Sequence, residues 1–197
     1  MRTVVLACAI FCPIAAEAQD FGIKGGISSA TLSFAPESGS PDLTDIRARR
    51  GFVGGIVVLM PGNSAGGWQI EAVINQKGAR NLLRQDDAIR LTYVEVPFLL
   101  HLDVFQADPF ALYVIAGPFV AFNVQASYED EGTTENIRDD VRKLDLGLQA
   151  GGGIEYGPLS VDGRYTWGLR SAFQDGDLEG SFKNRTFTVT AGIRFGR

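Results

Sequence analysis

The chain has 197 residues, with 23 acidic and 18 basic side chains, for a formal net charge of −5 at pH 7. This acidic balance argues against a nucleic-acid partner, because neutralising phosphates requires clustered Lys and Arg. No stretch beyond the N-terminus has the ~20 unbroken apolar residues that a membrane-spanning helix needs. The charge balance and the apolar pattern therefore exclude a nucleic-acid-binding protein and a helical membrane protein.

The N-terminus has the pattern of an export signal. Arg2 precedes an apolar run, Val4–Ala16, and the small residues of Ala16-Glu17-Ala18 follow it. This pattern is typical of a signal peptide. We expect residues 1–18 to be removed after Ala18, which leaves residues 19–197 as the mature domain.

Both cysteines, Cys8 and Cys12, fall within the predicted signal peptide. The mature chain would then have neither a thiol nor a disulfide, although export would permit one. The alternative is a lipid-modified cysteine at Val5-Leu6-Ala7-Cys8, but it would leave hardly any hydrophobic core before the cleavage site.

Period-two alternation of apolar and polar residues recurs along the mature chain, which predicts β-strands. Segments of this kind are bounded by Gly, Pro, Asn and Asp. Eight are expected, at Phe21–Ser33, Gly51–Met60, Gly67–Ala79, Arg90–Val104, Pro109–Gln125, Arg142–Tyr156, Leu159–Ala172 and Asn184–Phe195.

The connections between these segments alternate between longer and shorter. The longer ones are residues 34–50, 80–89, 126–141 and 173–183, and the shorter ones are residues 61–66, 105–108 and 157–158. Long loops at one rim and tight turns at the other are typical of outer-membrane barrels. The predicted fold is therefore all-β: an eight-stranded antiparallel up-and-down transmembrane β-barrel, with its long loops outside the cell.

The two faces of each predicted strand differ in polarity. In Gly67–Ala79, for example, Ile70, Ala72 and Ile74 share one face, whereas Glu71, Asn75 and Lys77 share the other. In a membrane barrel the apolar face would contact lipid. A soluble, lipocalin-like ligand-binding barrel would produce the same alternation with the apolar face inside, and it remains the alternative.

Aromatic residues fall at the ends of the apolar faces, which predicts two interfacial girdles. The expected girdle residues are Phe21, Trp68, Phe110, Tyr156 and Phe195 at the short-turn rim, and Phe122, Trp167 and Phe187 at the long-loop rim.

Charged residues of both signs fall on the polar faces. Buried ions are costly unless they are paired, so we expect a structural charge network inside the barrel, made by Lys24, Glu71, Glu95, Asp145, Asp162, Arg164 and Arg194. The interior of an eight-stranded barrel is just wide enough for side chains or one small ligand. A largely plugged lumen is the favoured interpretation, and a polar pathway for a small solute is the alternative.

His101 is the only histidine. An outer-membrane hydrolase acting on lipid would need a serine and an acidic partner beside it at the outer rim. The pattern places His101 near the short-turn end, pointing inward beside Asp103. We therefore expect no catalytic residues, no cofactor and no bound metal.

The long loops are acidic. Divalent cations could bridge their carboxylates to anionic lipopolysaccharide, although solvated, mutually repelling loops are the simpler interpretation. The residues concerned are Asp42, Asp45, Asp86, Asp87, Glu129, Asp130, Glu131, Asp139, Asp140, Asp175, Asp177 and Glu179.

Several residue strings resemble the PorT-like outer-membrane β-barrel family. They are Phe21-Gly-Ile-Lys-Gly-Gly-Ile27, Gln69-Ile-Glu71 with Asn75-Gln-Lys-Gly78, Tyr93-Val-Glu-Val-Pro97 with Phe98-Leu-Leu, and Tyr113 with Ala116-Gly-Pro118. The resemblance spans nearly the whole mature chain. It implies an eight-stranded outer-membrane barrel, common in Bacteroidetes-type Gram-negative bacteria and generally without an assigned enzymatic activity.

Two features depart from a regular barrel of this type. Such chains usually end in an aromatic residue that the barrel assembly machinery recognises, whereas Gly196 and Arg197 follow Phe195 here. Pro97 and Pro118 lie inside predicted strands, where a proline removes a hydrogen-bond donor, and we expect β-bulges at both.

The sequence thus predicts a non-enzymatic, integral outer-membrane protein with a structural or surface-interaction role. The expected partners are outer-membrane lipid, including lipopolysaccharide, and the barrel assembly machinery. No nucleic acid is expected, and the sequence identifies no protein partner.

Overall fold

The computed structural model describes residues 20–35, 47–62, 66–80, 88–130, 133–137, 141–171 and 181–196. Within these ranges we find no helical segment with the length and hydropathy that crossing a bilayer requires. The predicted signal peptide and its cleavage site lie outside the described residues. The described residues form nine strands: β1 (Asp20–Ala35), β2 (Arg47–Pro61), β3 (Gly66–Arg80), β4 (Ala88–Ala107), β5 (Phe110–Asp130), β6 (Thr133–Asn136), β7 (Leu144–Tyr156), β8 (Leu159–Ser171) and β9 (Ser181–Phe195).

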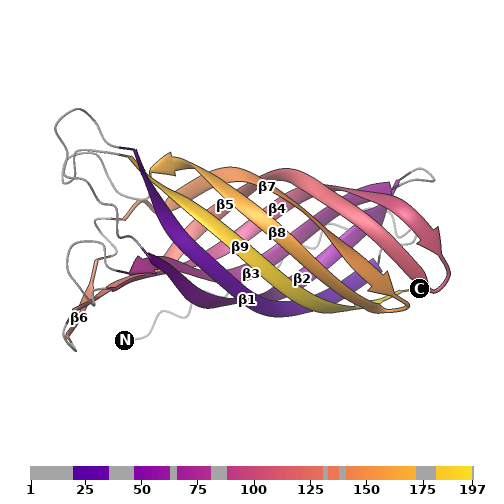
Figure 1. The fold of residues 1–197 in the computed structure, drawn as a ribbon, viewed down its shortest axis with the longest axis horizontal. Coiled ribbons are helices and arrows are strands. Elements are labelled where there is room, and N and C mark those ends of the chain that lie inside the picture. The colour runs from indigo at the N-terminus through magenta and orange to yellow at the C-terminus, as the bar shows by residue number, and fades with distance from the viewer. Residues whose placement is uncertain are drawn as a thin grey trace, which may run out of the picture.

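Eight of these strands close into an antiparallel barrel, as predicted. Each pairs with its neighbour in the order β1, β2, β3, β4, β5, β7, β8 and β9, and β9 pairs with β1 to complete the ring. Figure 1 shows the barrel from the side, with the end of β9 at the same rim as the β4–β5 and β7–β8 turns. Closure leaves no exposed sheet edge around the cylinder.

All eight predicted strands are present, and most extend further toward the long-loop rim than the alternation indicated. The largest difference is in β5, which continues to Asp130 and pairs with the short strand β6. Apolar and polar residues alternate where one face of a strand contacts lipid and the other faces the interior. The alternation is lost where a hairpin extends beyond the membrane-facing part of a barrel. Figure 1 shows β6 beyond the ring of strands, at the long-loop end.

The bulges expected at Pro97 and Pro118 are absent, so that prediction was wrong. Pairing between β3 and β4 is interrupted from Ile70–Phe98 to Val73–Glu95, but the register on both sides is the same. Pro118 keeps its partner Leu148 in β7. A proline removes one donor without adding a residue, and the neighbouring pairs hold the register.

The register shifts on β4 and β5 lie elsewhere. One falls between Thr92 and Tyr93, and the other between Asp103 and Phe105. Each leaves one unpaired residue, which is how a bulge bends a strand.

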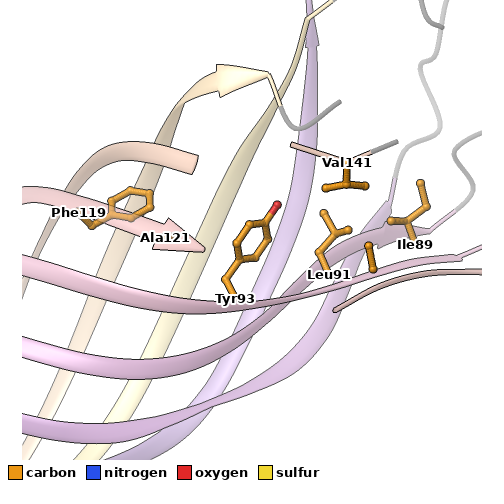
Figure 2. Close-up of a cluster of buried hydrophobic side chains, with 7 residues drawn as sticks. Ile89, Leu91, Tyr93, Phe119, Ala121 and Val141 are labelled. Atoms are coloured by element: carbon orange, nitrogen blue, oxygen red, sulfur yellow. The ribbon is translucent and has the colours of Figure 1, made fainter. Parts of the chain in front are cut away.

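Part of the barrel interior is apolar, which the division into one apolar and one polar face did not predict. Towards the long-loop rim, a buried cluster contains Ile89, Leu91, Tyr93, Phe119, Ala121, Ala126 and Val141. Figure 2 shows side chains of β4 and β5 in this cluster, with Val141 next to Leu91 and Ile89. A second, smaller cluster contains Leu99, Tyr113 and Ile115. From Ile89 to His101, the odd-numbered residues of β4 point inward whatever their polarity, because the pleat alternates.

Candidate functional site: the barrel interior

The charged face of the strands is the buried face. Glu71 is 3% exposed and Arg164 is 5% exposed, whereas Ile27 and Leu148 on the opposite face are 67% and 48% exposed. In a lipocalin-like barrel the apolar face would be the buried one. The structure therefore contradicts that alternative.

Four charged side chains from three strands meet in the interior. Lys24 of β1 contacts Glu71 of β3 at 3.1 Å and Asp162 of β8 at 3.0 Å. Arg164 of β8 contacts the same two carboxylates, Glu71 at 3.0 Å and Asp162 at 2.7 Å. We call these four residues the central ion cluster. It contains two cations and two anions, so it buries no net charge.

Neutral side chains extend the central ion cluster. The Thr190 hydroxyl of β9 donates to Asp162 Oδ2 at 2.7 Å, and the Gln69 amide donates to Glu71 Oε1. Arg164 uses Nε as well, donating to Asp162 Oδ1 at 2.8 Å. Charge-assisted and bidentate hydrogen bonds of this kind are among the strongest in proteins.

Glycines on neighbouring strands make room for the large inward side chains. Gly151 lies opposite Arg164, and a Cβ there would come within 2.7 Å of the Arg164 Cβ. Gly153 lies opposite Tyr113, and a Cβ there would be 2.5 Å from the Tyr113 ring. Gly151 and Gly153 thus serve side-chain packing in this narrow interior.

A second ion pair lies on the long-loop side of the central ion cluster. Lys77 Nζ of β3 is 2.6 Å from Glu95 Oε1 of β4. Asn75 and Gln149 donate to Glu95 Oε2, each at 3.4 Å. The Lys77 ammonium also lies 5.2 Å from the Tyr93 ring centre and 5.0 Å from that of Phe119, within range of a cation–π interaction.

The remaining predicted network residues lie apart from the central ion cluster; Glu95 and Asp145 are buried, and Arg194 is half-buried. Asp145 accepts a hydrogen bond from Asn184 at 2.8 Å, and Arg194 forms an ion pair with Glu155. The structure therefore brings together Lys24, Glu71, Asp162 and Arg164, and leaves Glu95, Asp145 and Arg194 with other partners. Lys77 and Glu155 were not among the residues predicted for the network, although alternation places both on the inward face.

His101 lies inside the barrel, stacked on Tyr113 with ring centres 4.4 Å apart. Its Nδ1 is 2.8 Å from Gln69 Oε1, and its Nε2 is 3.3 Å from Asp103 Oδ1. Both ring nitrogens thus already have partners. Because Gln69 also contacts Glu71, a polar chain runs from Asp103 through His101 to the central ion cluster.

Small cavities lie between these side chains. One of about 10 Å³ is lined by residues that include Glu71, Glu95 and Arg164, and one of about 20 Å³ by residues that include Gln69, Asp162 and Arg194. A cavity must offer ~10–15 Å³ to hold one water molecule. Each is therefore of the size of one or two waters.

The predicted girdle residues lie on the outward face. Phe21 pairs with Phe195 across β1 and β9, and Phe110 pairs with Tyr156 across β5 and β7. Seven of the eight are exposed, between 37% for Phe21 and Trp167 and 63% for Tyr156, and Phe110 is half-buried. Their depth in a bilayer stays a prediction.

Most of the acidic loop residues lie outside the described residues. Glu129 and Asp130 are the exceptions, because their backbone continues β5 to its pairing with β6.

A closed eight-stranded barrel with a buried charged face and an exposed apolar face defines the class of outer-membrane β-barrels. Residues 17–174 match the family model named outer membrane protein beta-barrel domain. The chain belongs to this family, and it is a protein of the bacterial outer membrane. No curated protein sequence matches it.

Two solved structures of outer-membrane barrels, NspA and OprG, share the fold. Neisserial surface protein A (NspA) is 14% identical, with a TM-score of 0.51, over 89% of this chain and 97% of its own. OprG from Pseudomonas aeruginosa is also 14% identical, with a TM-score of 0.51, over 91% of this chain and 97% of its own. Ail of Yersinia pestis, in complex with the heparin analogue sucrose octasulfate, is 17% identical over 91% of this chain and 100% of its own, with a TM-score of 0.47.

Proposed function

We propose that the protein is a non-enzymatic barrel that maintains a sealed, ion-paired interior in the outer membrane and acts through its outer surface and loops. The observation that carries the proposal is the central ion cluster, in which two cations and two carboxylates from β1, β3 and β8 meet at 2.7 to 3.1 Å. A solute would have to break these contacts to pass. Separating the four side chains would leave buried, unpaired charges, which is costly.

Four further features support a sealed interior. The Lys77–Glu95 pair and the apolar cluster around Leu91 lie on the long-loop side of the central ion cluster. The two cavities of about 10 and 20 Å³ among the described interior side chains are each the size of one or two water molecules. Eight strands leave an interior that side chains can fill. A structural and surface-interaction role follows, rather than transport.

The contacts of His101 support the absence of hydrolase activity. A hydrolytic triad needs a free imidazole nitrogen within ~2.6–3.2 Å of a serine hydroxyl. The nitrogens of His101 instead contact Gln69 and Asp103 inside the barrel. The same proposal has three further parts. The protein belongs to the PorT-like group, it is exported by a signal peptide cleaved after Ala18, and the barrel assembly machinery recognises it.

Single-channel recording in planar bilayers tests the sealed interior. The folded protein, verified by heat-modifiable migration in gels, should produce no discrete conductance steps. The matched control is the variant Lys24→Ala/Glu71→Ala/Asp162→Ala/Arg164→Ala, which removes the whole cluster without leaving an unpaired member. It should conduct ions. Reproducible conductance steps from the unmodified protein would overturn the proposal.

A further inference from the structure

Three cations lie on the outward face at the long-loop ends of β2 and β9. Lys183 and Arg185 of β9 alternate with Asn184 and share their face with the exposed Phe187. On β2, Arg50 shares the outward face with Phe52 in the same way. Strand β1 lies between them, because it pairs with both β2 and β9.

Cross-strand pairing adds two hydroxyl groups to these cations. Ser29 of β1 is the direct partner of Arg50 on one side and of Phe187 on the other. Thr31 of β1 is the partner of Arg185. Directly opposite residues lie ~4.5–5.5 Å apart, so the five side chains form one continuous surface. We call Arg50, Lys183, Arg185, Ser29 and Thr31 the basic patch.

No carboxylate among the described residues of β1, β2, β8 and β9 offsets this positive charge on the outward face. The acidic residues there are Asp20, at the short-turn end of β1, and Asp162, which belongs to the central ion cluster. No ion pair involving Arg50, Lys183 or Arg185 is found within the described part of the chain, and Arg50 is exposed. Lys183 and Arg185 are half-buried. The basic patch therefore carries three positive charges that no described carboxylate of these four strands offsets.

The basic patch begins where the outward aromatic residues end. Trp167 of β8 is the direct partner of Arg185, and Tyr165 is the partner of Phe187. Strands rise ~3.4 Å per residue, so Arg185 lies about 7 Å beyond Phe187 along β9, and Lys183 a further 7 Å. Aromatic residues favour the membrane interface. The cations next to them then lie at the level of lipid headgroups.

We propose that the basic patch binds the phosphate groups of an anionic glycolipid of the outer leaflet. The long loops of such barrels face the outside, so the patch faces that leaflet. A guanidinium binds phosphate through two parallel hydrogen bonds, and the Lys ammonium adds a compact charge. Tyr165, Trp167 and Phe187 provide an apolar surface below, against which acyl chains pack. This names a site for the surface-interaction part of the proposed function, and it is independent of whether the interior is sealed.

Lipid binding in detergent micelles tests the proposal. Diphosphoryl lipid A is titrated into the folded protein, and the bound fraction is measured by native mass spectrometry. A basic residue near an anionic surface strengthens binding about fivefold. Arg185→Gln should therefore weaken binding about fivefold, and Arg50→Gln/Lys183→Gln/Arg185→Gln about 100-fold.

Controls separate the site from general charge effects. Lys143→Gln removes an exposed cation at the same rim but outside the basic patch, and it should leave binding within twofold of the unmodified protein. Arg50→Lys/Arg185→Lys keeps the charge and should retain most of the affinity. Lipid A stripped of phosphate should bind at least tenfold more weakly than the diphosphoryl form.

Four results would overturn the proposal. The first is unchanged lipid binding by the triple variant, or by Arg185→Gln if the triple variant does not fold, and the second is an equal loss of binding with Lys143→Gln. The third is equal binding of dephosphorylated lipid A, and the fourth is complete competition by millimolar inorganic phosphate, which would indicate an ion site. Conductance by the unmodified protein would refute the sealed interior and leave the basic patch untouched.

Discussion

Replacing Arg164 by Met removes one of the two cations of the central ion cluster. The guanidinium holds Glu71 at 3.0 and 3.1 Å and Asp162 at 2.7 and 2.8 Å, and the side chain is 5% exposed. Without it, Lys24 alone faces two carboxylates, so one negative charge is left buried without compensation. Breaking a buried pair by removing one partner costs about 3–5 kcal/mol. We expect the free energy of unfolding to fall by that amount.

The assay is reversible urea unfolding in lipid vesicles, followed by tryptophan fluorescence. Arg164→Lys keeps the charge but loses the bidentate contact, and it should have an intermediate effect. The double variant Arg164→Met/Glu71→Gln leaves Lys24 and Asp162 as a balanced pair, so it should be more stable than Arg164→Met alone. A loss below about 1 kcal/mol for Arg164→Met, a value typical of an exposed ion pair, would refute the reasoning. So would additivity in the double variant.

Other substitutions test the packing on both faces with the same unfolding assay. Leu91→Ala empties a fully buried position in the apolar cluster and should lower the free energy of unfolding by about 2–5 kcal/mol. Leu169→Ala on the exposed face should lower it by less than about 0.5 kcal/mol. Equal losses would contradict the assignment of Leu91 to the inward face and Leu169 to the outward face. Gly147→Ala places a Cβ 2.5 Å from the Phe119 ring and should cost about 1–3 kcal/mol, while Gly163→Ala meets its nearest atom at 3.7 Å and should be close to neutral. Leu148→Arg, on the outward face near the middle of β7, should lower the free energy of unfolding by about 2–4 kcal/mol. Leu159→Arg, at the start of β8 next to a turn, should lower it by about 0–1 kcal/mol. The reverse order would contradict the expected depths of these two residues in the bilayer.

The sequence predicted the barrel because alternation is a direct consequence of closure in lipid. Each strand has one face in contact with acyl chains and one face inside, so residues such as Leu148 and Gln149 differ in polarity at every step. The rule also placed Lys24, Glu71, Asp162 and Arg164 on one face.

The choice of ion partners could not be predicted from alternation. Pairing depends on strand register and barrel stagger, which bring Lys24 of β1 to Asp162 of β8 across 138 positions of sequence. Lys77 lies on the same inward face as Glu71, yet its partner is Glu95. A list of inward charges therefore predicts a network without predicting its pairs.

The apolar part of the interior was missed for a different reason. Alternation placed Glu95, His101 and Asp103 on the inward face of β4, and Tyr93 and Leu99 share that face although they are apolar. Because the inward face was expected to be polar, these two side chains were not predicted as an apolar core, where Leu99 packs with Tyr113 and Ile115. The two prolines led to a wrong prediction of bulges. Pro97 and Pro118 each remove a backbone hydrogen-bond donor, but neither shifts the strand register.

Tryptophan quenching by brominated lipids tests most directly whether the apolar face of this barrel contacts acyl chains. The chain has two tryptophans, Trp68 on β3 and Trp167 on β8, which are 45% and 37% exposed on the outward face. In vesicles of brominated phosphatidylcholine, single-tryptophan variants retaining either one should be strongly quenched, and aqueous acrylamide should quench them weakly. Strong acrylamide quenching of both without an effect of brominated lipid would contradict the membrane-facing assignment of the apolar surface.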